Sequence, residues 1–329
     1  MLDIRSSRLR QPIKRLEFHM SYKCNSHCIF CSESVRMAKY EDSPVTFAEM
    51  IRTVTRKRRE GCVHITFVGG EPTIHPRFLD LLAATKRLGY STLLITNGVR
   101  LASPDFCAKA LPLLDEIVFS VHGHTPQLHD ALARSPGSFL KVTSALKNIE
   151  TFEKRPFVLT NTVVTRHNLG ELPRIIEFLA SFEAVRHCLV SNLAPDGSAL
   201  KDYAEQAVRV GDIGALAPEL AAIARARGVA LRFFGMPLCV LGPQWRLSND
   251  LHWDSRTNVE RATVDGKATL EDTWNYTPQR MRHFPSECEG CVMKGKCWGV
   301  FKTYFDRFGG DELRALKRRR ASKGSLKAG

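Results

Sequence analysis

The predicted order of strands and helices constrains the fold of this chain most. Alternating apolar residues predict strands at 16–22, 63–68, 91–96, 116–121, 157–165 and 185–191. Helical periodicity predicts helices that follow them, near 46–60, 76–88, 104–113, 138–153 and 170–182. This regular β-then-α order favours a parallel sheet with helical crossovers. Two α/β architectures remain open on this evidence, a barrel and an open doubly wound sheet.

The composition changes after Gly235 and suggests a second, smaller domain. The chain has 329 residues, enough for one large domain and a small one. An Ala-rich helical stretch at 202–227 and a strand at 229–234 end the regular series. We therefore predict a core domain over 1–235, a cysteine-rich, metal-stabilised domain of short irregular segments over 236–310, and a basic, flexible tail over 311–329.

The ten cysteines bear on the compartment of the protein. The start of the sequence has no apolar run typical of a secretion signal, and no run approaches the roughly 20 residues that cross a bilayer. A long chain with an ample core does not need disulfides as a small secreted domain does. We therefore expect a cytoplasmic protein, without membrane contact, whose cysteines serve metal binding or catalysis.

The net charge of +14 allows an anionic partner but does not choose one. The tail over 311–329 holds seven Lys or Arg against two acidic residues. The basic runs contain no interleaved aromatic residues, and no RNA-binding motif is visible. Nucleic acid is therefore not the favoured partner, although a basic RNA-binding protein and a non-catalytic metal scaffold remain the competing classes.

A group of three cysteines follows the first predicted strand. Cys24, Cys28 and Cys31 lie within eight residues, in the sequence CNSHCIFC. A structural zinc site normally takes four protein ligands, and His27 is an awkward fourth because it adjoins Cys28. Three cysteines on a 4Fe–4S cube would leave one iron open for another ligand. The spacing favours such a cluster, and a zinc knuckle is the alternative.

The same cysteine spacing, with further motifs, resembles the radical S-adenosylmethionine (SAM) superfamily over residues 16–193. The CxxxCxxC pattern carries an aromatic residue, Phe30, before its last cysteine. Gly-Gly-Glu-Pro at 69–72 follows the second strand, and Thr-Asn-Gly at 96–98 follows the third. Ser-Val-His-Gly at 120–123 follows the fourth strand, where family motifs also lie. Cysteines followed by Gly-Gly-Glu-Pro at the next strand end make the resemblance specific.

The resemblance implies a partial (β/α)6 barrel with its active site at the carboxyl ends of the strands. It implies that the three cysteines hold a 4Fe–4S cluster and that SAM binds the open iron. The backbone of the glycine motif would meet the methionine amino group, and its glycines permit a close approach. Many relatives carry Asp where His122 stands, so its contact is a weaker expectation. The cofactor-binding residues implied in this way are Phe30, Gly69, Gly70, Glu71, Pro72, Asn97, Ser120, His122 and Asn161.

A second group of cysteines lies in the 236–310 segment. Cys288, Cys291 and Cys297 lie close together in the sequence, and Cys239 precedes them by about 50 residues. Four thiolates can complete a metal site without another ligand. The segment resembles the twitch and SPASM auxiliary-cluster domains of the same superfamily. This resemblance implies an auxiliary 4Fe–4S cluster, and a structural zinc is the alternative.

The implied activity is reductive cleavage of SAM to a 5′-deoxyadenosyl radical that abstracts hydrogen from a substrate. Only about 15 residues precede the first strand, which favours a small molecule (a nucleotide, sugar or natural product) over a peptide or protein. An electron donor such as flavodoxin or ferredoxin is the other expected partner. Cys188 is expected to be a packed core residue. The sequence identifies no general acid or base.

Overall fold

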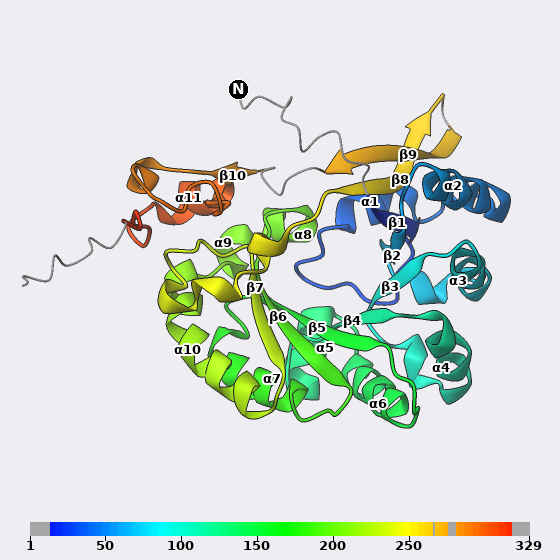
Figure 1. The fold of residues 1–329 in the computed structure, drawn as a ribbon, viewed down its shortest axis with the longest axis horizontal. Helices are drawn as coiled ribbons and strands as arrows, with labels where there is room; N and C mark the ends of the chain where they lie inside the picture. Colours follow the sequence, from blue (N-terminus) through cyan, green and yellow to red (C-terminus); the bar gives the residue numbers. More distant parts are fainter. Residues whose placement is uncertain (1–13, 266, 276–280, 318–329) are drawn as a thin grey trace, which may run out of the picture.

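The computed structural model describes residues 14–265, 267–275 and 281–317 and has an α/β fold (Figure 1). The parallel strands of the main sheet are β1 (Arg15–Ser21), β2 (His64–Gly69), β3 (Ser91–Thr96), β4 (Glu116–Ser120), β5 (Phe157–Val164), β6 (Val185–Asn192) and β7 (Ala230–Phe234). The sheet continues past β1 through β8 (Arg256–Val264) and β9 (Lys267–Asn275). The predicted strand series is confirmed.

Helices follow the strands and cover the outer face of the sheet (Figure 1). Those in the first half are α1 (Ser34–Tyr40), α2 (Phe47–Arg59), α3 (Phe78–Arg87), α4 (Pro104–Ala110), α5 (Pro126–Ala133) and α6 (Ser138–Glu150). Those in the second half are α7 (Leu172–Leu179), α8 (Gly197–Lys201), α9 (Tyr203–Gln206), α10 (Val210–Ala226) and α11 (Lys302–Phe308). The predicted helix at 202–227 is thus divided between α9 and α10.

The sheet is an open, partial barrel. Its strands lie in the order β7-β6-β5-β4-β3-β2-β1-β8-β9, so β7 and β9 form the two ends. Within the described residues these two end strands do not pair with each other. The expected partial barrel is therefore confirmed. Its parallel part contains the six strands of the predicted barrel, the further strand predicted at 229–234, which is β7, and β8, which pairs in parallel with β1.

The two faces of the sheet differ in their side chains. In β4, Ile117 and Phe119 are fully buried under the helices, whereas Val118 and Ser120, which alternate with them, are half-buried on the inner face. The same alternation runs along β5. Because successive side chains of a strand point to opposite faces, the outer face forms the core and the inner face stays partly accessible.

The hairpin of β8 and β9 was not predicted, because 236–310 was expected to contain only short irregular segments. Its two antiparallel strands are nine residues long, and β8 pairs in parallel with β1. Ionic contacts join the hairpin to α2, where Asp272 of β9 contacts Arg56 and the buried Lys57. Charged residues at these positions weaken the apolar alternation from which strands are predicted.

The C-terminal part of the described chain lies beside the carboxyl ends of β6 and β7 (Figure 1). It contains a short sheet of β10 (Arg282–His283) and β11 (Val300–Phe301), followed by α11. The strands β8 and β9 lie within the predicted small domain over 236–310, but they belong to the main sheet. The division of the chain at 235/236 remains a prediction. Most of the expected flexible tail, 318–329, lies outside the described residues.

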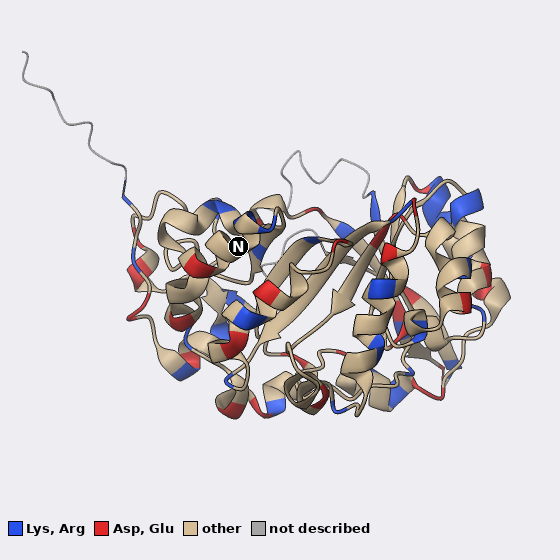
Figure 2. Ribbon diagram, turned by 90° about the horizontal axis from the view of Figure 1, so that it is seen from below, with Lys and Arg blue, Asp and Glu red and all other residues tan. Residues whose placement is uncertain are grey.

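Charged side chains of both signs are interspersed over the helices (Figure 2). The basic run at 56–59 has partners in the protein: Arg56 and Lys57 bind carboxylates, and Arg58 donates to the Leu88 carbonyl. None of the helices in the described residues has both the length and the apolar character that a membrane crossing requires.

Candidate functional site

The loop with the first three cysteines lies at the carboxyl end of β1, beside the glycine motif after β2. Ser21 at the end of β1 is in register with Gly69 at the end of β2. The Gly70 amide donates to the Ser21 carbonyl at 2.7 Å, and the Glu71 amide donates to the Lys23 carbonyl at 2.8 Å. The two motifs that the sequence analysis identified are therefore joined by backbone hydrogen bonds.

Both glycines are required for this contact. Gly69 has a φ of +123°, and a Cβ atom on it would lie 2.3 Å from the Ser21 oxygen. A Cβ on Gly70 would lie 2.2 Å from the Lys23 oxygen. These distances are far below van der Waals contact, so side chains at 69 and 70 would push the two loops apart. The glycines thus permit a close approach of this motif to the cysteine loop, and their approach to SAM remains a prediction.

The cysteine loop is fixed by two further segments of the barrel. The His27 and Ile29 amides each donate at 3.0 Å to carbonyls at the end of α5. From the segment after β6, the Ser198 amide donates to the Cys31 carbonyl at 2.9 Å. Gln206 Nε2 donates to the Ile29 carbonyl at 3.0 Å. The loop backbone is thus held on several sides at the carboxyl edge of the sheet.

The thiols of this loop fit an iron–sulfur cluster in their chemistry. Burial raises the pKa of Cys24 to about 12 and that of Cys28 to about 12, and it also raises the pKa of Cys31. The negative charge of the Cys31 thiolate raises the pKa of Cys24 and of Cys28 further, and the Cys24 thiolate also raises the pKa of Cys28. Buried thiols that repel one another as thiolates need nearby positive charge to ionise, and iron supplies it.

A cube of four irons is wider than a single metal ion, so its ligands need not converge on one point. In residues 14–317, apart from 266 and 276–280, no three His, Cys, Asp or Glu side chains gather closely enough to hold one ion. The assignment of Cys24, Cys28 and Cys31 to a cluster remains a prediction.

Glu71 and Asn97 lie where the glycine motif meets the loop after β3. The Glu71 side chain is 1% exposed, and burial raises its pKa. It accepts hydrogen bonds from Thr73, Thr96 and the Asn97 amide. Asn97 Nδ2 in turn donates to Asn25 of the cysteine loop at 2.7 Å. These two predicted cofactor residues therefore contact protein groups through their side chains.

Phe30 and His122 lie next to each other at the carboxyl ends of the strands. Their ring centroids are 4.7 Å apart in an edge-to-face arrangement. His122 Nδ1 accepts a hydrogen bond from the Val163 amide at 3.3 Å, which assigns the proton of the neutral ring to Nε2. Burial lowers the pKa of His122 to about 3. His122 is therefore a neutral hydrogen-bond donor in the folded protein.

The remaining predicted SAM residues also lie at this edge of the sheet. Ser120 of β4 and Asn161 of β5 are in register, and Ser191 donates to Asn161 Oδ1 at 2.6 Å. Pro72 is buried at the first position of a 3₁₀ turn over Pro72–Ile74. Cofactor contacts of Ser120, Asn161 and Pro72 remain predictions, although their positions suit them.

The second group of cysteines also comes together. Cys239, Cys288, Cys291 and Cys297 line one small pocket in the C-terminal part of the chain. Burial raises the pKa of Cys288 to about 11, and the charges of the other three thiolates raise it further. The pKa of Cys297 is also raised, mainly by burial. Cys239 thus lies with three cysteines that follow it by about 50 residues around one space, which suits the predicted auxiliary metal site.

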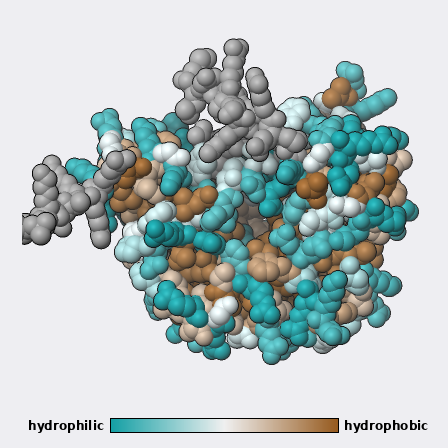
Figure 3. Space-filling model, viewed as in Figure 1, coloured by the Kyte–Doolittle hydropathy of each residue, from teal (hydrophilic) through white to brown (hydrophobic). Residues whose placement is uncertain are grey.

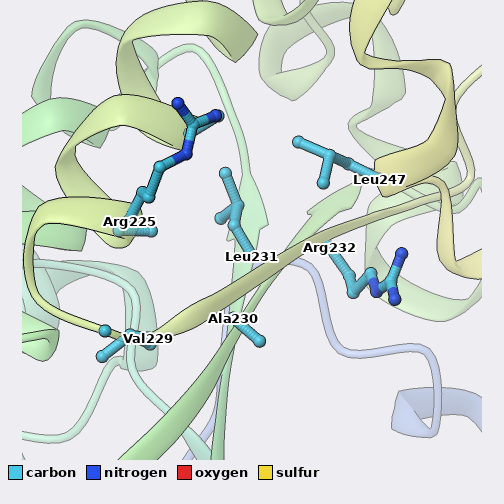
Figure 4. A pocket seen from close by; sticks show the side chains of 9 residues that line it. Arg225, Val229, Ala230, Leu231, Arg232 and Leu247 are labelled. Atoms are coloured by element: carbon cyan, nitrogen blue, oxygen red, sulfur yellow. The ribbon is translucent and has the colours of Figure 1, made fainter.

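Another pocket, of about 370 Å³, lies between α10 and the end strand β7 (Figure 4). Arg225, Leu231 and Leu247 are among its lining residues. Its described lining includes none of the predicted site residues. We do not assign a function to this pocket.

Hydrophobic residues form separate patches among hydrophilic ones on the face shown in Figure 3.

Some residues of the site were not found from the sequence. Gly197 and Gln206 contact the cysteine loop but follow it by more than 160 residues, and no motif marks them. Cys188, in contrast, is fully buried in the core as expected. Arg186 is exposed and His187 is half-buried on β6.

Solved structures with this fold include two of SuiB from Streptococcus suis. SuiB bound to S-adenosylmethionine matches with a TM-score of 0.61 and 14% identity, over 92% of this chain and 76% of that chain. SuiB bound to its precursor peptide SuiA matches with a TM-score of 0.54 and 18% identity, over 67% of this chain and 48% of that chain. At this identity the similarity establishes the fold, and this chain spans about half of the peptide-bound SuiB chain.

A third solved structure, native anSMEcpe with bound AdoMet and the Kp18Cys peptide, matches with a TM-score of 0.52 and 19% identity. This match covers 66% of this chain and 63% of that chain. Residues 18–179, which include the three cysteines and the glycine motif, match the model of the Radical SAM superfamily. The chain therefore belongs to the radical SAM superfamily, whose enzymes use a 4Fe–4S cluster and SAM.

Proposed function

We propose that Cys24, Cys28 and Cys31 hold the 4Fe–4S cluster of this enzyme and that its substrate is a peptide or protein. The observation that carries the first part is the backbone pairing of the cysteine loop with the glycine motif. When bound, the cluster supplies the electron that cleaves SAM to methionine and a 5′-deoxyadenosyl radical, which abstracts hydrogen from the substrate.

The other residues at the carboxyl edge bind and orient SAM in this proposal. The backbone of the glycine motif receives the methionine amino group. Phe30 lies against the adenine, and the neutral His122 donates from Nε2 to an acceptor of the nucleoside. Burial of Phe30 and His122 helps to exclude water.

The substrate class is supported by the relatives and by the open sheet. SuiB and anSMEcpe were both solved with peptides. The inner face of the partial barrel has half-buried positions such as Val118 and Leu189, which leaves it accessible to an extended chain. The sequence favoured a small molecule, and that class is now the competing outcome. Stimulation of SAM cleavage by candidate peptides, but not by sugars or nucleotides, would support the peptide proposal.

The auxiliary site is proposed to hold a second 4Fe–4S cluster. Its support is the pocket lined by Cys239, Cys288, Cys291 and Cys297. Flavodoxin or ferredoxin is the proposed donor to the first cluster, as expected from the resemblance. A structural zinc at the auxiliary site is the alternative that metal analysis separates.

The cluster assignment is tested by anaerobic reconstitution with iron, sulfide, SAM and dithionite. We expect the wild type to form 5′-deoxyadenosine, measured by chromatography. Cys28→Ala should reduce this by at least 100-fold, about 2.7 kcal/mol, because two thiolates hold a cube poorly. Cys188→Ala is the matched control, since it removes a buried thiol of the core. Equal product from Cys28→Ala and the wild type would contradict the assignment.

A further inference from the structure

The Glu71 carboxylate accepts hydrogen bonds from two loops of the site. It accepts from the Thr73 amide at 3.1 Å and from the Thr73 hydroxyl at 2.6 Å, both within its own loop. It also accepts from the Thr96 hydroxyl at 2.8 Å and the Asn97 amide at 2.7 Å, in the loop after β3. Four donors on two oxygens use most of the acceptor capacity of this buried carboxylate. The side chain therefore has little capacity left to bind a ligand.

Asn97 in turn forms hydrogen bonds with the cysteine loop. Its Oδ1 accepts from the Val99 amide at 3.1 Å, which fixes the orientation of the side-chain amide. Its Nδ2 then donates to Asn25 Oδ1 at 2.7 Å and to Ser26 Oγ at 3.2 Å. Asn25 and Ser26 lie between Cys24 and Cys28, so Asn97 holds the part of the loop that sets the spacing of these two thiols.

The same amide lies close to one of the thiols. Asn97 Nδ2 is 4.0 Å from Cys24 Sγ, and the Ser26 amide, in the segment that Asn97 holds, donates to that sulfur at 3.4 Å. N–H dipoles that point at a ligand sulfur stabilise its negative charge. Hydrogen bonds to the sulfurs are among the factors that set the reduction potential of an iron–sulfur cluster.

We propose that Glu71 and Asn97 are positioning residues that fix the segment between Cys24 and Cys28 and thereby set the stability and reduction potential of the cluster. Glu71 orients Asn97, and Asn97 orients Asn25 and Ser26. Neither side chain needs to contact SAM for this role. The inference rests on the proposed function, because it requires a cluster on these cysteines.

The test compares Asn97→Ala, Asn97→Asp and Glu71→Gln in the anaerobically reconstituted full chain. We expect Asn97→Ala and Glu71→Gln to lose iron to a chelator about 10–100-fold faster than the wild type. Asn97→Asp places negative charge beside Cys24 instead of an N–H donor, so redox titration followed by electron paramagnetic resonance should give a more negative midpoint potential. The Glu71→Gln/Asn97→Ala double variant should lose iron little faster than either single variant, because both changes break one connection.

Asn148→Ala is the matched control for a merely structural asparagine. Asn148 Nδ2 donates to the carbonyls of Leu101 and Ala102, away from the cysteines. It should lower the thermal unfolding temperature while leaving the potential and the iron release unchanged. If the Asn97 variants keep the wild-type potential and iron release, the inference is wrong. A wild-type protein that binds no cluster at all would instead contradict the proposed function.

Discussion

The two neighbouring histidines His122 and His129 show how burial fixes the state of a side chain in this site. The His122 amide donates to His129 Nδ1 at 3.2 Å, and the two rings stack with centroids 6.0 Å apart. Burial lowers the pKa of His122 to about 3 and that of His129 to about 4. Both rings are therefore neutral in the folded protein over the physiological range, whereas in the unfolded chain they titrate near 6.5.

This difference predicts a loss of stability in mild acid. Below pH 6.5 the unfolded chain binds protons that the folded histidines do not bind, so the free energy of unfolding falls as the pH falls towards 4. Each such group contributes about 1.4 kcal/mol per pH unit. Denaturant unfolding of the wild type between pH 7 and pH 5 should show this fall. His129→Gln should reduce the total fall over this range by about 2 kcal/mol, because the slope reaches its full value only below pH 6.5. An unchanged slope in the variant would show that His129 is not neutral when buried.

Gly197 is a residue whose contact with the cysteine loop only the structure reveals. Its φ is +55°, and a Cβ on it would lie 2.2 Å from the Cys31 oxygen. We expect Gly197→Ala to destabilise the fold and to lower the iron content, because α8 can no longer rest on the cysteine loop. The control is Gly228→Ala, at a φ of +68° with no atom within 4 Å of the added Cβ. It carries a backbone strain of about 1–3 kcal/mol without the clash. Equal unfolding energies and iron contents for the two variants would contradict a specific contact at Cys31.

At the scale of elements, the hairpin of β8 and β9 extends the sheet and is held to α2 mainly by charge. The Lys57 ammonium is 2% exposed and contacts Asp272 at 2.7 Å, while Arg56 contacts the same carboxylate at 2.9 Å. Although burial alone would raise the pKa of Asp272, hydrogen bonds from Arg56 and Lys57 lower it. Lys57 also contacts Glu60 at 2.7 Å, so Asp272 is the one of its two carboxylate partners that lies on the hairpin. The contacts of Asp272 with Arg56 and Lys57 therefore fasten the hairpin to α2.

Asp272→Ala should therefore destabilise the protein by about 2 kcal/mol, measured by denaturant unfolding at neutral pH, because Lys57 loses one charged hydrogen-bond partner and keeps Glu60. Asp254→Ala is the control, because its ion pair with Arg15 is exposed and should cost less than about 1 kcal/mol. Since the folded pKa of Asp272 is lowered, its contribution is present above about pH 4 and is lost as the pH falls through the folded pKa. If the two variants lose similar amounts of unfolding free energy at neutral pH, the contact of Asp272 with α2 stabilises the protein no more than an exposed ion pair does.

The sequence allowed the parallel strands to be predicted well, and the hairpin not at all. Strand 91–96 was predicted with its bounds, because it contains the apolar run Leu93–Ile95 and alternates between buried and half-buried positions. The 256–264 strand of the hairpin has Arg, Asn and Glu at alternate positions, so its apolar signal is weak. The cysteine and glycine motifs could be placed together because each follows a strand. The contacts of Gly197 and Gln206 depend on a chain path that local patterns do not encode.

At the scale of the whole molecule, the open sheet carries two groups of cysteines. Cys24, Cys28 and Cys31 lie at the carboxyl end of β1, and the auxiliary group lies in the C-terminal part beside the carboxyl ends of β6 and β7 (Figure 1). Both groups thus lie at the edge of the sheet where α/β enzymes bind their substrates. The segment after β6 touches the first cysteine loop and leads to Arg209, directly before α10, which forms an ion pair with Asp311 of the C-terminal part. This path physically connects the two predicted metal centres.

If the two centres are separate, they can be removed separately. Cys291→Ala should lower the total iron by about half, because the auxiliary pocket loses one of its four thiolates while the loop after β1 is intact. The low-potential electron paramagnetic resonance signal of the first cluster should persist, and its shift on addition of SAM should be unchanged. Cys62→Ser, at a buried cysteine outside both groups, is the control and should leave the iron content unchanged. Unchanged iron in Cys291→Ala, with zinc found in the wild type, would identify the C-terminal centre as structural zinc and restrict the redox chemistry to the first cluster.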